Sequence, residues 1–236
     1  MTTKEILKQL ESLGSEQTKK ILLKHGAREP VYGVKVEDMK KLVKQVKENK
    51  NKTAIELFHT GIYDAVYLAG LIGDGSGMSK KELQDMAKAS KGGWGSEYAI
   101  PWLATESPYT LELALEWIDS KTETIATCGW CTLSSMVACT EDEKLDTVLL
   151  KKLLARVEKE IHKAPNRVRY TMNGYLVALG CFVKDLTDDV IAACKRIGPV
   201  SVDMNGTACK VPLATDYITK LKAKNALGKK RKNIKC

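Results

Sequence analysis

The segment APNRVRYTMNGYLVALG, residues 164–180, combines side chains that bind phosphate with the apolar residues of a buried helix. Its pattern predicts a helix that begins just after the proline, with Arg167 and Arg169 in the first turn. A helix N-terminus with free backbone N–H groups favours anions, and arginine can make two directed contacts to one phosphate. Tyr170 and Asn173 lie one turn further on, where a base or sugar would follow. These residues are therefore candidates for binding nucleic acid.

A basic C-terminal segment favours this interpretation over a polar patch held by carboxylates such as Glu158 or Asp203. Residues 220–236 contain eight basic residues and no acidic residue, whereas the rest of the chain has 30 basic and 29 acidic residues and is nearly neutral. Such a basic arm is typical of proteins that bind nucleic acid; a solubilising tail is the alternative. The phosphate contacts are assigned to Lys229, Lys230, Arg231 and Lys232.

A second motif, CGWC at 128–131, could carry redox or metal chemistry. A redox motif needs a strand that leads into a helix, but here Cys128 and Cys131 lie in the middle of a predicted helix. A zinc site would need two further ligands, and the sequence has no second pair at a suitable spacing. The thiols are thus predicted to be structural. No nucleotide-binding glycine motif is present, so neither a metal nor an organic cofactor is expected.

The composition is that of a globular protein. Of the 236 residues 44% are hydrophobic and 28% charged, and no apolar run approaches the roughly 20 residues that span a bilayer. The N-terminal segment has the pattern of an amphipathic helix and not of a signal peptide. A cytoplasmic protein with reduced cysteines is therefore expected.

Helical periodicity extends over almost the whole chain, with breaks at glycine and proline. Pro101 is expected to kink its helix, and residues 199–212 are predicted to be an ordered loop. The predicted helices are 3–13, 15–25, 36–48, 52–59, 62–73, 79–91, 96–106, 108–119, 122–138, 146–162, 166–183, 187–197 and 211–223.

From residue 62 onward the predicted helices form pairs that repeat every 30–45 residues. This spacing is near the roughly 40–47 residues of HEAT and armadillo repeats. We therefore predict an all-α, HEAT-like or armadillo-like superhelix of antiparallel helix pairs, and not a four-helix bundle. Residues 1–224 are predicted to form a single domain, and residues 225–236 a basic C-terminal tail.

Several stretches resemble a bacterial subgroup of the DNA alkylation repair family, which includes an alkylpurine DNA glycosylase built from HEAT-like repeats. The resemblance covers most of residues 30–236. The stretches are GIYDAVYLAGLIGD (61–74), SEYAIPWLATES (96–107), LALEWIDS (113–120), APNRVRYTMNGYLVALG (164–180), VDMNGTACKVP (202–212) and GKKRKNIKC (228–236).

The resemblance implies a site with altered residues. Glu97, four residues before Pro101, matches the family's catalytic aspartate, and Gly93 stands where the family has tryptophan, with Trp94 beside it. Thr127 stands at the position of a family arginine. A second family tryptophan corresponds to Tyr175, so that Trp94, Tyr175 and Glu97 are expected to face the DNA lesion.

Two functions remain open at this point. The first is a protein that binds double-stranded DNA through its phosphates and releases cationic alkylated purines, with Glu97 stabilising the positive charge that develops on the sugar. The second is a non-catalytic helical-repeat scaffold that binds DNA structures or a protein or peptide partner. A positively charged groove would favour DNA, and an apolar groove would favour a peptide.

Overall fold

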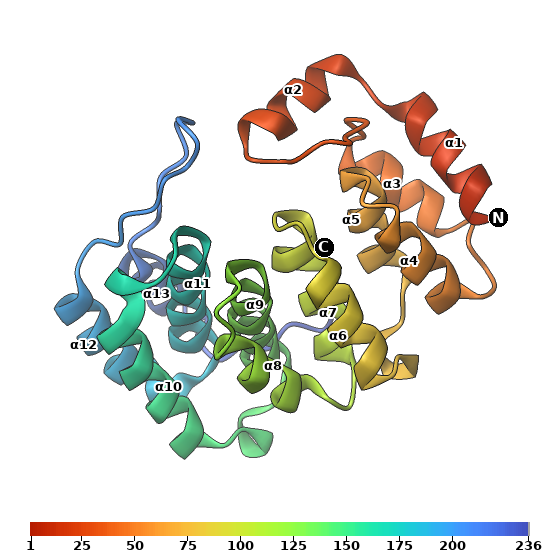
Figure 1. Cartoon of the computed structure of the whole chain (residues 1–236). Helices are drawn as coiled ribbons and strands as arrows, with labels where there is room; N and C mark the ends of the chain where they lie inside the picture. Colours follow the sequence, from red (N-terminus) through yellow and green to blue (C-terminus); the bar gives the residue numbers. More distant parts are fainter. Residues whose placement is uncertain (236) are drawn as a thin grey trace.

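The computed structural model describes residues 1–235. All regular secondary structure in this range is helical, and no strand is assigned within it. The helices follow one another along an arc (Figure 1), so the predicted all-α superhelix is confirmed. None of these helices is long and apolar enough to cross a membrane. The α-helices are α1 (Thr3–Leu13), α2 (Glu16–Lys24), α3 (Val36–Val43), α4 (Lys50–His59), α5 (Tyr63–Ile72), α6 (Lys80–Ala89), α7 (Ile100–Glu106), α8 (Thr110–Ile118), α9 (Glu123–Cys139), α10 (Thr147–Glu160), α11 (Asn166–Phe182), α12 (Thr187–Ile197) and α13 (Ala214–Ala223).

Most of the chain folds into two layers. Helices α5, α7, α9 and α11 pack side by side as the inner layer, and α4, α6, α8, α10 and α12 lie along the outer side of the arc (Figure 1). Since alternate helices of the chain belong to the same layer, neighbouring inner helices run in the same direction. Their N-terminal ends therefore lie on one side of the molecule and their C-terminal ends on the other.

The helix starts follow from local side-chain chemistry. Ser79 and Glu82 form a capping box at α6, in which each side chain accepts a hydrogen bond from the other residue's backbone. Thr2 and Glu5 do the same at α1. Thr187 is a residue type that often caps helices, but here it is the first residue of α12 itself. Its hydroxyl is buried and donates to the Gly180 carbonyl at 3.0 Å, because a tertiary acceptor is available at the end of α11.

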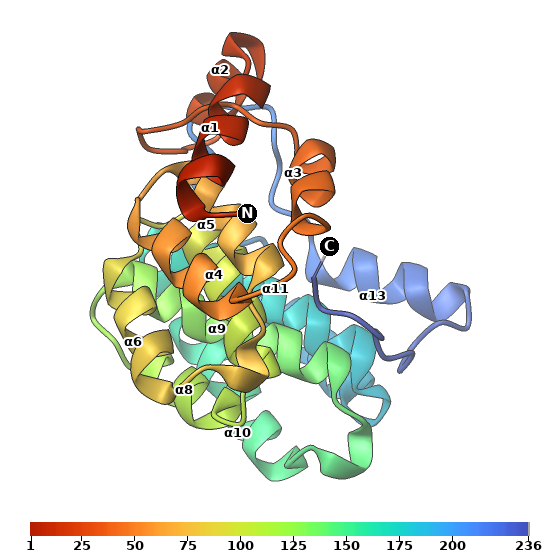
Figure 2. The same cartoon turned by 90° about the vertical axis from the view of Figure 1, so that its right-hand side faces the viewer.

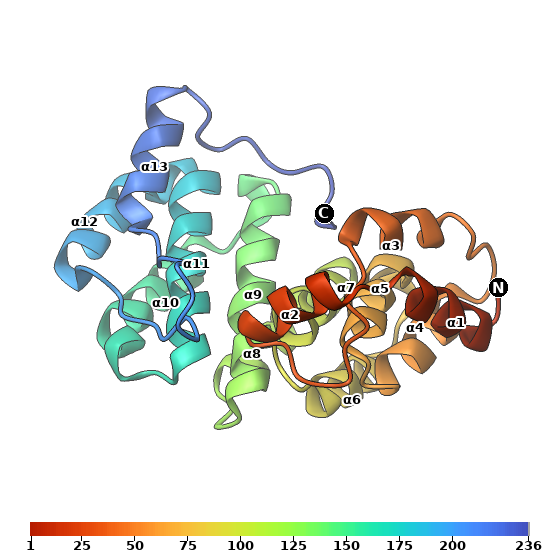
Figure 3. The ribbon, with the colours of Figure 1, turned by 90° about the horizontal axis from the view of Figure 1, so that it is seen from above.

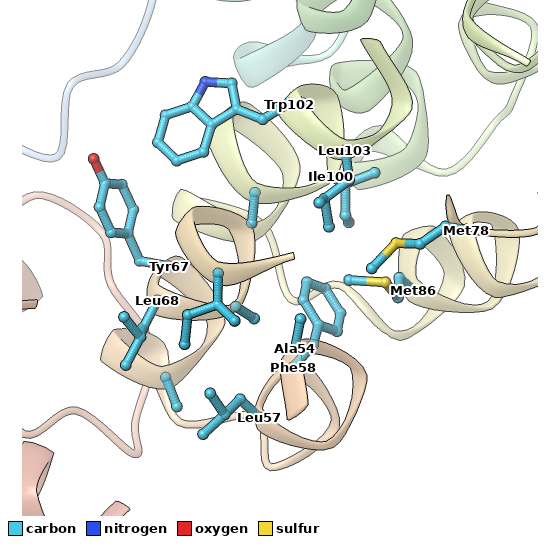
Figure 4. Close-up of a cluster of buried hydrophobic side chains, with 14 of the residues drawn as sticks. Ala54, Leu57, Phe58, Tyr67, Leu68, Met78, Met86, Ile100, Trp102 and Leu103 are labelled. Atoms are coloured by element: carbon cyan, nitrogen blue, oxygen red, sulfur yellow. The ribbon is translucent and has the colours of Figure 1, made fainter. Parts of the chain in front are cut away.

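Two buried hydrophobic clusters make up the core and meet at α8 and α9. The N-terminal cluster includes Phe58, Leu68 and Trp102, which pack between α4, α5 and α7 (Figure 4). In the C-terminal cluster, Trp130 and Tyr175 are almost fully buried. Helices α8 and α9 contribute to both clusters, so the core continues from one to the other, and the division into one domain and a tail stays a prediction.

A buried carboxylate fixes the segment that enters the solenoid. Asp64, in the first turn of α5, is completely buried. Its side chain accepts hydrogen bonds from the backbone N–H groups of Tyr32, Gly33 and Val34 at 2.7, 3.3 and 2.7 Å. A buried charge is tolerated when several donors surround it, so Asp64 holds residues 32–34 against the N-terminal end of α5.

The last described residues, 228–235, cross the C-terminal ends of the inner helices and are called here the C-terminal strap (Figure 3). The Gly228 N–H donates to a carbonyl at the end of α11, at 2.9 Å, and the Arg231 N–H donates to a carbonyl near the end of α9, at 2.7 Å. The Lys235 ammonium donates to the Gly73 carbonyl just after α5 and lies 2.9 Å from the carboxylate of Glu106 at the end of α7. The strap thus supplies donors to all four inner helices.

The strap changes the expected role of the basic tail. Lys230 donates to the Val137 carbonyl at 2.9 Å and pairs with Asp142 at 2.7 Å, leaving only 8% of its side chain exposed. Ile234 is buried in the N-terminal cluster. Lys230 was predicted to bind phosphate and is instead engaged by the protein. Helix C-termini have carbonyls without partners and a partial negative charge, and both attract a lysine.

Two neighbouring lysines separate the structural role of the strap from its charge. Lys230→Met should lower the free energy of unfolding by about 1–2 kcal/mol, because it leaves a carbonyl and a carboxylate without their donor. Lys229→Met removes the same charge from an exposed residue and should change the free energy of unfolding by less than about 0.5 kcal/mol. Urea unfolding followed by circular dichroism measures both. Equal losses would show that the strap is not docked in solution.

Candidate nucleic-acid interface

A cleft of about 640 Å³ opens at the N-terminal ends of the inner helices. The first turn of each inner helix, or the turn before it, contributes to one wall: Tyr63 from α5, Glu97 from the turn before α7, Thr124 from α9 and Arg167 from α11. Partial positive charges from several helix ends therefore point toward one space. The sequence predicted such an end only for α11.

Two segments from opposite ends of the chain form the other wall. The turn after α2 contributes His25 and Arg28, and the loop 199–212 contributes Cys209 and Lys210. This loop contains no helix or strand, as predicted, and extends beside α2 (Figure 2). The Cys209 sulfur lies 3.9 Å from Nδ1 of His25. The first and last parts of the solenoid thus meet over the cleft.

A single π-helical turn, η2 (Gly95–Ala99), places Glu97 at the floor of the cleft. The Glu97 N–H donates to the Gly93 carbonyl at 2.9 Å, and Pro101 follows in the first turn of α7. Proline has no N–H and its ring disturbs the preceding turn, so a wider turn before it is a physical consequence of its position. The kink expected at Pro101 takes this form.

Glu97 and Arg167 form a two-pronged ion pair across the cleft floor. Arg167 donates from Nε and Nη2 to Oε1 of Glu97, at 2.9 and 2.6 Å, and from Nη2 to Oε2 at 2.8 Å. The guanidinium carbon of Arg167 also lies 4.3 Å from the centre of the Tyr170 ring. Three residues singled out from the sequence are thus brought together, although Arg167 contacts a carboxylate where a phosphate was expected.

Burial decides the protonation behaviour of this cluster. The Glu97 side chain is only 11% exposed, and loss of hydration raises the pKa of its carboxyl, while the charge of Arg167 opposes that rise. Burial also raises the pKa of Tyr98 and Tyr170. Both phenols therefore stay neutral and act as hydrogen-bonding or stacking groups at physiological pH.

The N-terminal end of α11 is partly satisfied from within the protein. The Arg167 N–H donates to the carboxylate of Glu123, the first residue of α9, at 2.7 Å, and Asn166 binds the backbone of Asp203 through both ends of its amide, at 2.9 and 2.7 Å. The helix end that was predicted to bind a phosphate thus already contacts a carboxylate and the 199–212 loop.

Aromatic rings line the floor beside the ion pair. Trp94 is stacked on Tyr63 with ring centres 4.6 Å apart and lies 4.5 Å from the ring centre of Tyr67. Gly93 has a positive φ of 53°, and a Cβ there would lie 2.7 Å from the Tyr63 hydroxyl. A side chain is therefore not accommodated at residue 93, and Trp94 supplies the ring that lines the cleft.

Thr127 shows what the altered site lacks. Its side chain lines the cleft and is 2% exposed, and its hydroxyl has no hydrogen-bond partner among the described residues. At this position the resemblance implies an arginine. The arginine beside Glu97 comes instead from α11, one helix further along the inner layer.

Three cations of the cleft were missed from the sequence: Arg28, Lys91 and Lys210. They lie in three segments far apart in the chain and none belongs to a local motif. Unlike Arg167, none forms an ion pair with a described residue. Only the closure of the arc brings them together.

Other predicted site residues lie outside the cleft. Tyr175 is fully buried, with its ring centre 5.4 Å from that of Trp130, so the prediction that it faces the lesion does not fit the structure. Asn173 is buried and donates to the Pro212 carbonyl at 3.1 Å. Arg169 is half-buried, and its Nε has no partner among residues 1–235. Lys229–Lys232 belong to the strap, at the other end of the inner helices.

The chain is similar to several known proteins. A sequence model described as "DNA alkylation repair enzyme" matches residues 6–196. The Listeria innocua protein Lin0241 and the Listeria monocytogenes protein Lmo0209 are each 28% identical to it over 216 residues, covering 90% of this chain and 93% of theirs. A solved structure described as "A new family of proteins related to the HEAT-like repeat DNA glycosylases with affinity for branched DNA structures" superimposes with a TM-score of 0.92 at 31% identity, over 100% of both chains.

The two thiols of the CGWC motif are predicted to be unreactive, and their burial allows this to be tested. Cys128 is fully buried, and burial raises its pKa to about 12 and that of Cys131 well above its ordinary value. Neither forms the reactive thiolate at pH 7.5, since the thiolate appears only as the pH approaches the raised pKa. In the native protein iodoacetamide should label the exposed Cys209 and spare both. Peptide mass mapping would reveal this, and rapid labelling of Cys128 would contradict the structure.

Proposed function

This chain belongs to the family of DNA alkylation repair enzymes, and on this premise we propose that its cleft binds the phosphate backbone of branched DNA. The HEAT-like relative that matches the whole chain is described by its affinity for such DNA. The observation that carries the proposal is the set of unpaired cations on both walls of the cleft. A cytoplasmic location, as predicted, suits this function.

The charges of the cleft support a polyanionic ligand. Four of the lining residues are lysine or arginine and two carry carboxylates, Glu97 and Glu123. Both carboxylates bind Arg167, one through its side chain and one through its backbone N–H. The charges of Arg28, Lys91 and Lys210 therefore remain for phosphates, and binding should depend strongly on salt.

The arrangement of these cations favours a branch over a straight duplex. Arg28 follows α2 and Lys210 lies in the 199–212 loop, the two segments of one wall, whereas Lys91 precedes the π-helical turn in the other wall, so the cations lie on both walls of the cleft. The arms of a branched DNA present phosphates in several directions around one point. The polar lining also suits DNA better than an apolar peptide, which was the alternative partner.

The ion pair at the floor does not favour excision of cationic bases. An enzyme of that kind needs a negative charge where the sugar becomes positive. In this chain Arg167 donates to both oxygens of Glu97 and largely cancels that charge. DNA binding without base release is therefore the function that the cleft supports best.

The first experiment removes the three unpaired cations together. Arg28→Ala with Lys91→Ala and Lys210→Ala should weaken binding to a four-way junction at least about tenfold at moderate salt. The slope of log K against log salt should become shallower by about three, since each phosphate contact contributes about 0.9. The matched control carries Lys8→Ala, Lys144→Ala and Lys195→Ala, three exposed lysines outside the cleft. Equal losses in both variants would mean that net charge, and not the cleft, determines binding.

The second experiment tests the ion pair. Glu97→Gln keeps the size of the side chain, removes its charge and leaves Arg167 free to bind a phosphate. Affinity for the junction should rise several-fold, and the salt slope should become steeper by about one. Neither wild type nor variant should release 7-methylguanine from alkylated duplex above a protein-free sample. Release by the wild type that disappears in the variant would instead identify Glu97 as a catalytic carboxylate.

A further inference from the structure

A smaller hollow of about 210 Å³ adjoins the cleft along the inner face of α9 and α11. Glu97, Tyr98 and Tyr170 line both spaces. From these residues the hollow continues toward the C-terminal ends of the inner helices, where Arg231 and Ile234 of the strap close it. One continuous surface thus joins the N-terminal ends of the inner helices to the strap.

The walls of this hollow combine aromatic rings, of which Tyr98 is exposed, Tyr170 half-buried and Trp102 buried, with a cation that has no acidic partner among residues 1–235. Tyr98 is 38% exposed and meets Trp102 edge to face, with ring centres 5.6 Å apart. Arg231 forms no ion pair with a described residue, and its guanidinium carbon lies 5.4 Å from the ring centre of Phe182. Rings on which bases stack, together with cations for phosphates, characterise sites for single-stranded nucleic acid.

The floor of the hollow leaves room for a ligand. Gly174, in the middle of α11, lies on this floor, and a Cβ added there would have no heavy atom within 4 Å. Glycine inside a helix lowers helix stability, and at this position no neighbour requires it. The adjoining residues of α9, Cys131, Ser134 and Ser135, are also small.

We propose that this hollow, here called the strand groove, binds the unpaired nucleotides at the branch point of a DNA whose paired arms contact the cleft. The inference rests on the proposed function and specifies its ligand. The groove is too small for a double helix but is open to single bases. From Thr124 in the cleft to Ser135 in the groove, α9 rises about 16 Å, so a short unpaired run suffices to reach the strap. Charge complementarity to Arg231 and continuity with the cleft favour a DNA strand over other occupants.

The test compares two DNA ligands. One is a fully paired four-way junction, and the other is the same junction with a short run of unpaired thymidines at the branch point. Wild type should bind the second at least about fivefold more tightly, because stacking adds to the phosphate contacts. Gly174→Trp should fill the groove and abolish this preference while the affinity for the paired junction stays at the wild-type level. Gly174→Ala, which adds only a methyl group, should keep the preference.

The variants must be folded for the comparison, and circular dichroism with thermal unfolding checks this. If Gly174→Trp does not fold, Ser135→Trp fills the groove from α9 and should have the same effect. A preference retained in a folded blocking variant would overturn the strand groove, as would a wild type that binds both junctions equally. Either result would leave binding by the cleft intact, whereas failure to bind any junction would overturn the proposed function itself.

Discussion

The parallel alignment of the four inner helices is the constraint on which the cleft and the strap both depend. Neighbouring helices that run in the same direction bring like ends of their dipoles together, which is unfavourable unless opposite charges compensate. Carboxylates fill that role at the N-terminal ends, where Asp64, Glu97 and Glu123 bind backbone or guanidinium groups. Lys230 and Lys235 fill it at the C-terminal ends. The protein therefore has an anion-attracting side and a lysine-capped side.

This polarity explains how the cleft stays cationic although Thr127 stands where the resemblance implies an arginine. Thr127 has no charge, yet an arginine still reaches Glu97, because α11 begins beside α9 at the same side of the molecule. Arg167 then pairs with Glu97, the buried carboxylate at the cleft floor. The surrounding cations Arg28, Lys91 and Lys210 have no acidic partner within residues 1–235 and line the cleft. The groups that attract DNA are therefore different from the carboxylate that base excision would need.

Much of the fold could be predicted from the sequence, because helix periodicity, caps and breaks are local signals. The polar start of α11 was also local, and Arg167 and Tyr170 do lie in the cleft. Tyr175 was placed wrongly. Five residues beyond Tyr170, it points about 140° away on a helix, toward the core. Arg28 and Lys210 could not be found, since only the curvature of the solenoid brings the two ends of the chain to one space.

The C-terminal strap is synthesised long after the helices whose ends it caps. Lys235 follows its acceptor at Gly73 by 162 residues. At the usual synthesis rates of about 5–20 residues per second, α5 leaves the ribosome about 8–30 seconds before its last cap exists. During that interval the inner helices expose free carbonyls at their C-terminal ends, and the apolar site for Ile234 is uncovered. The arc can therefore grow pair by pair, but its ends become fully satisfied only late in translation.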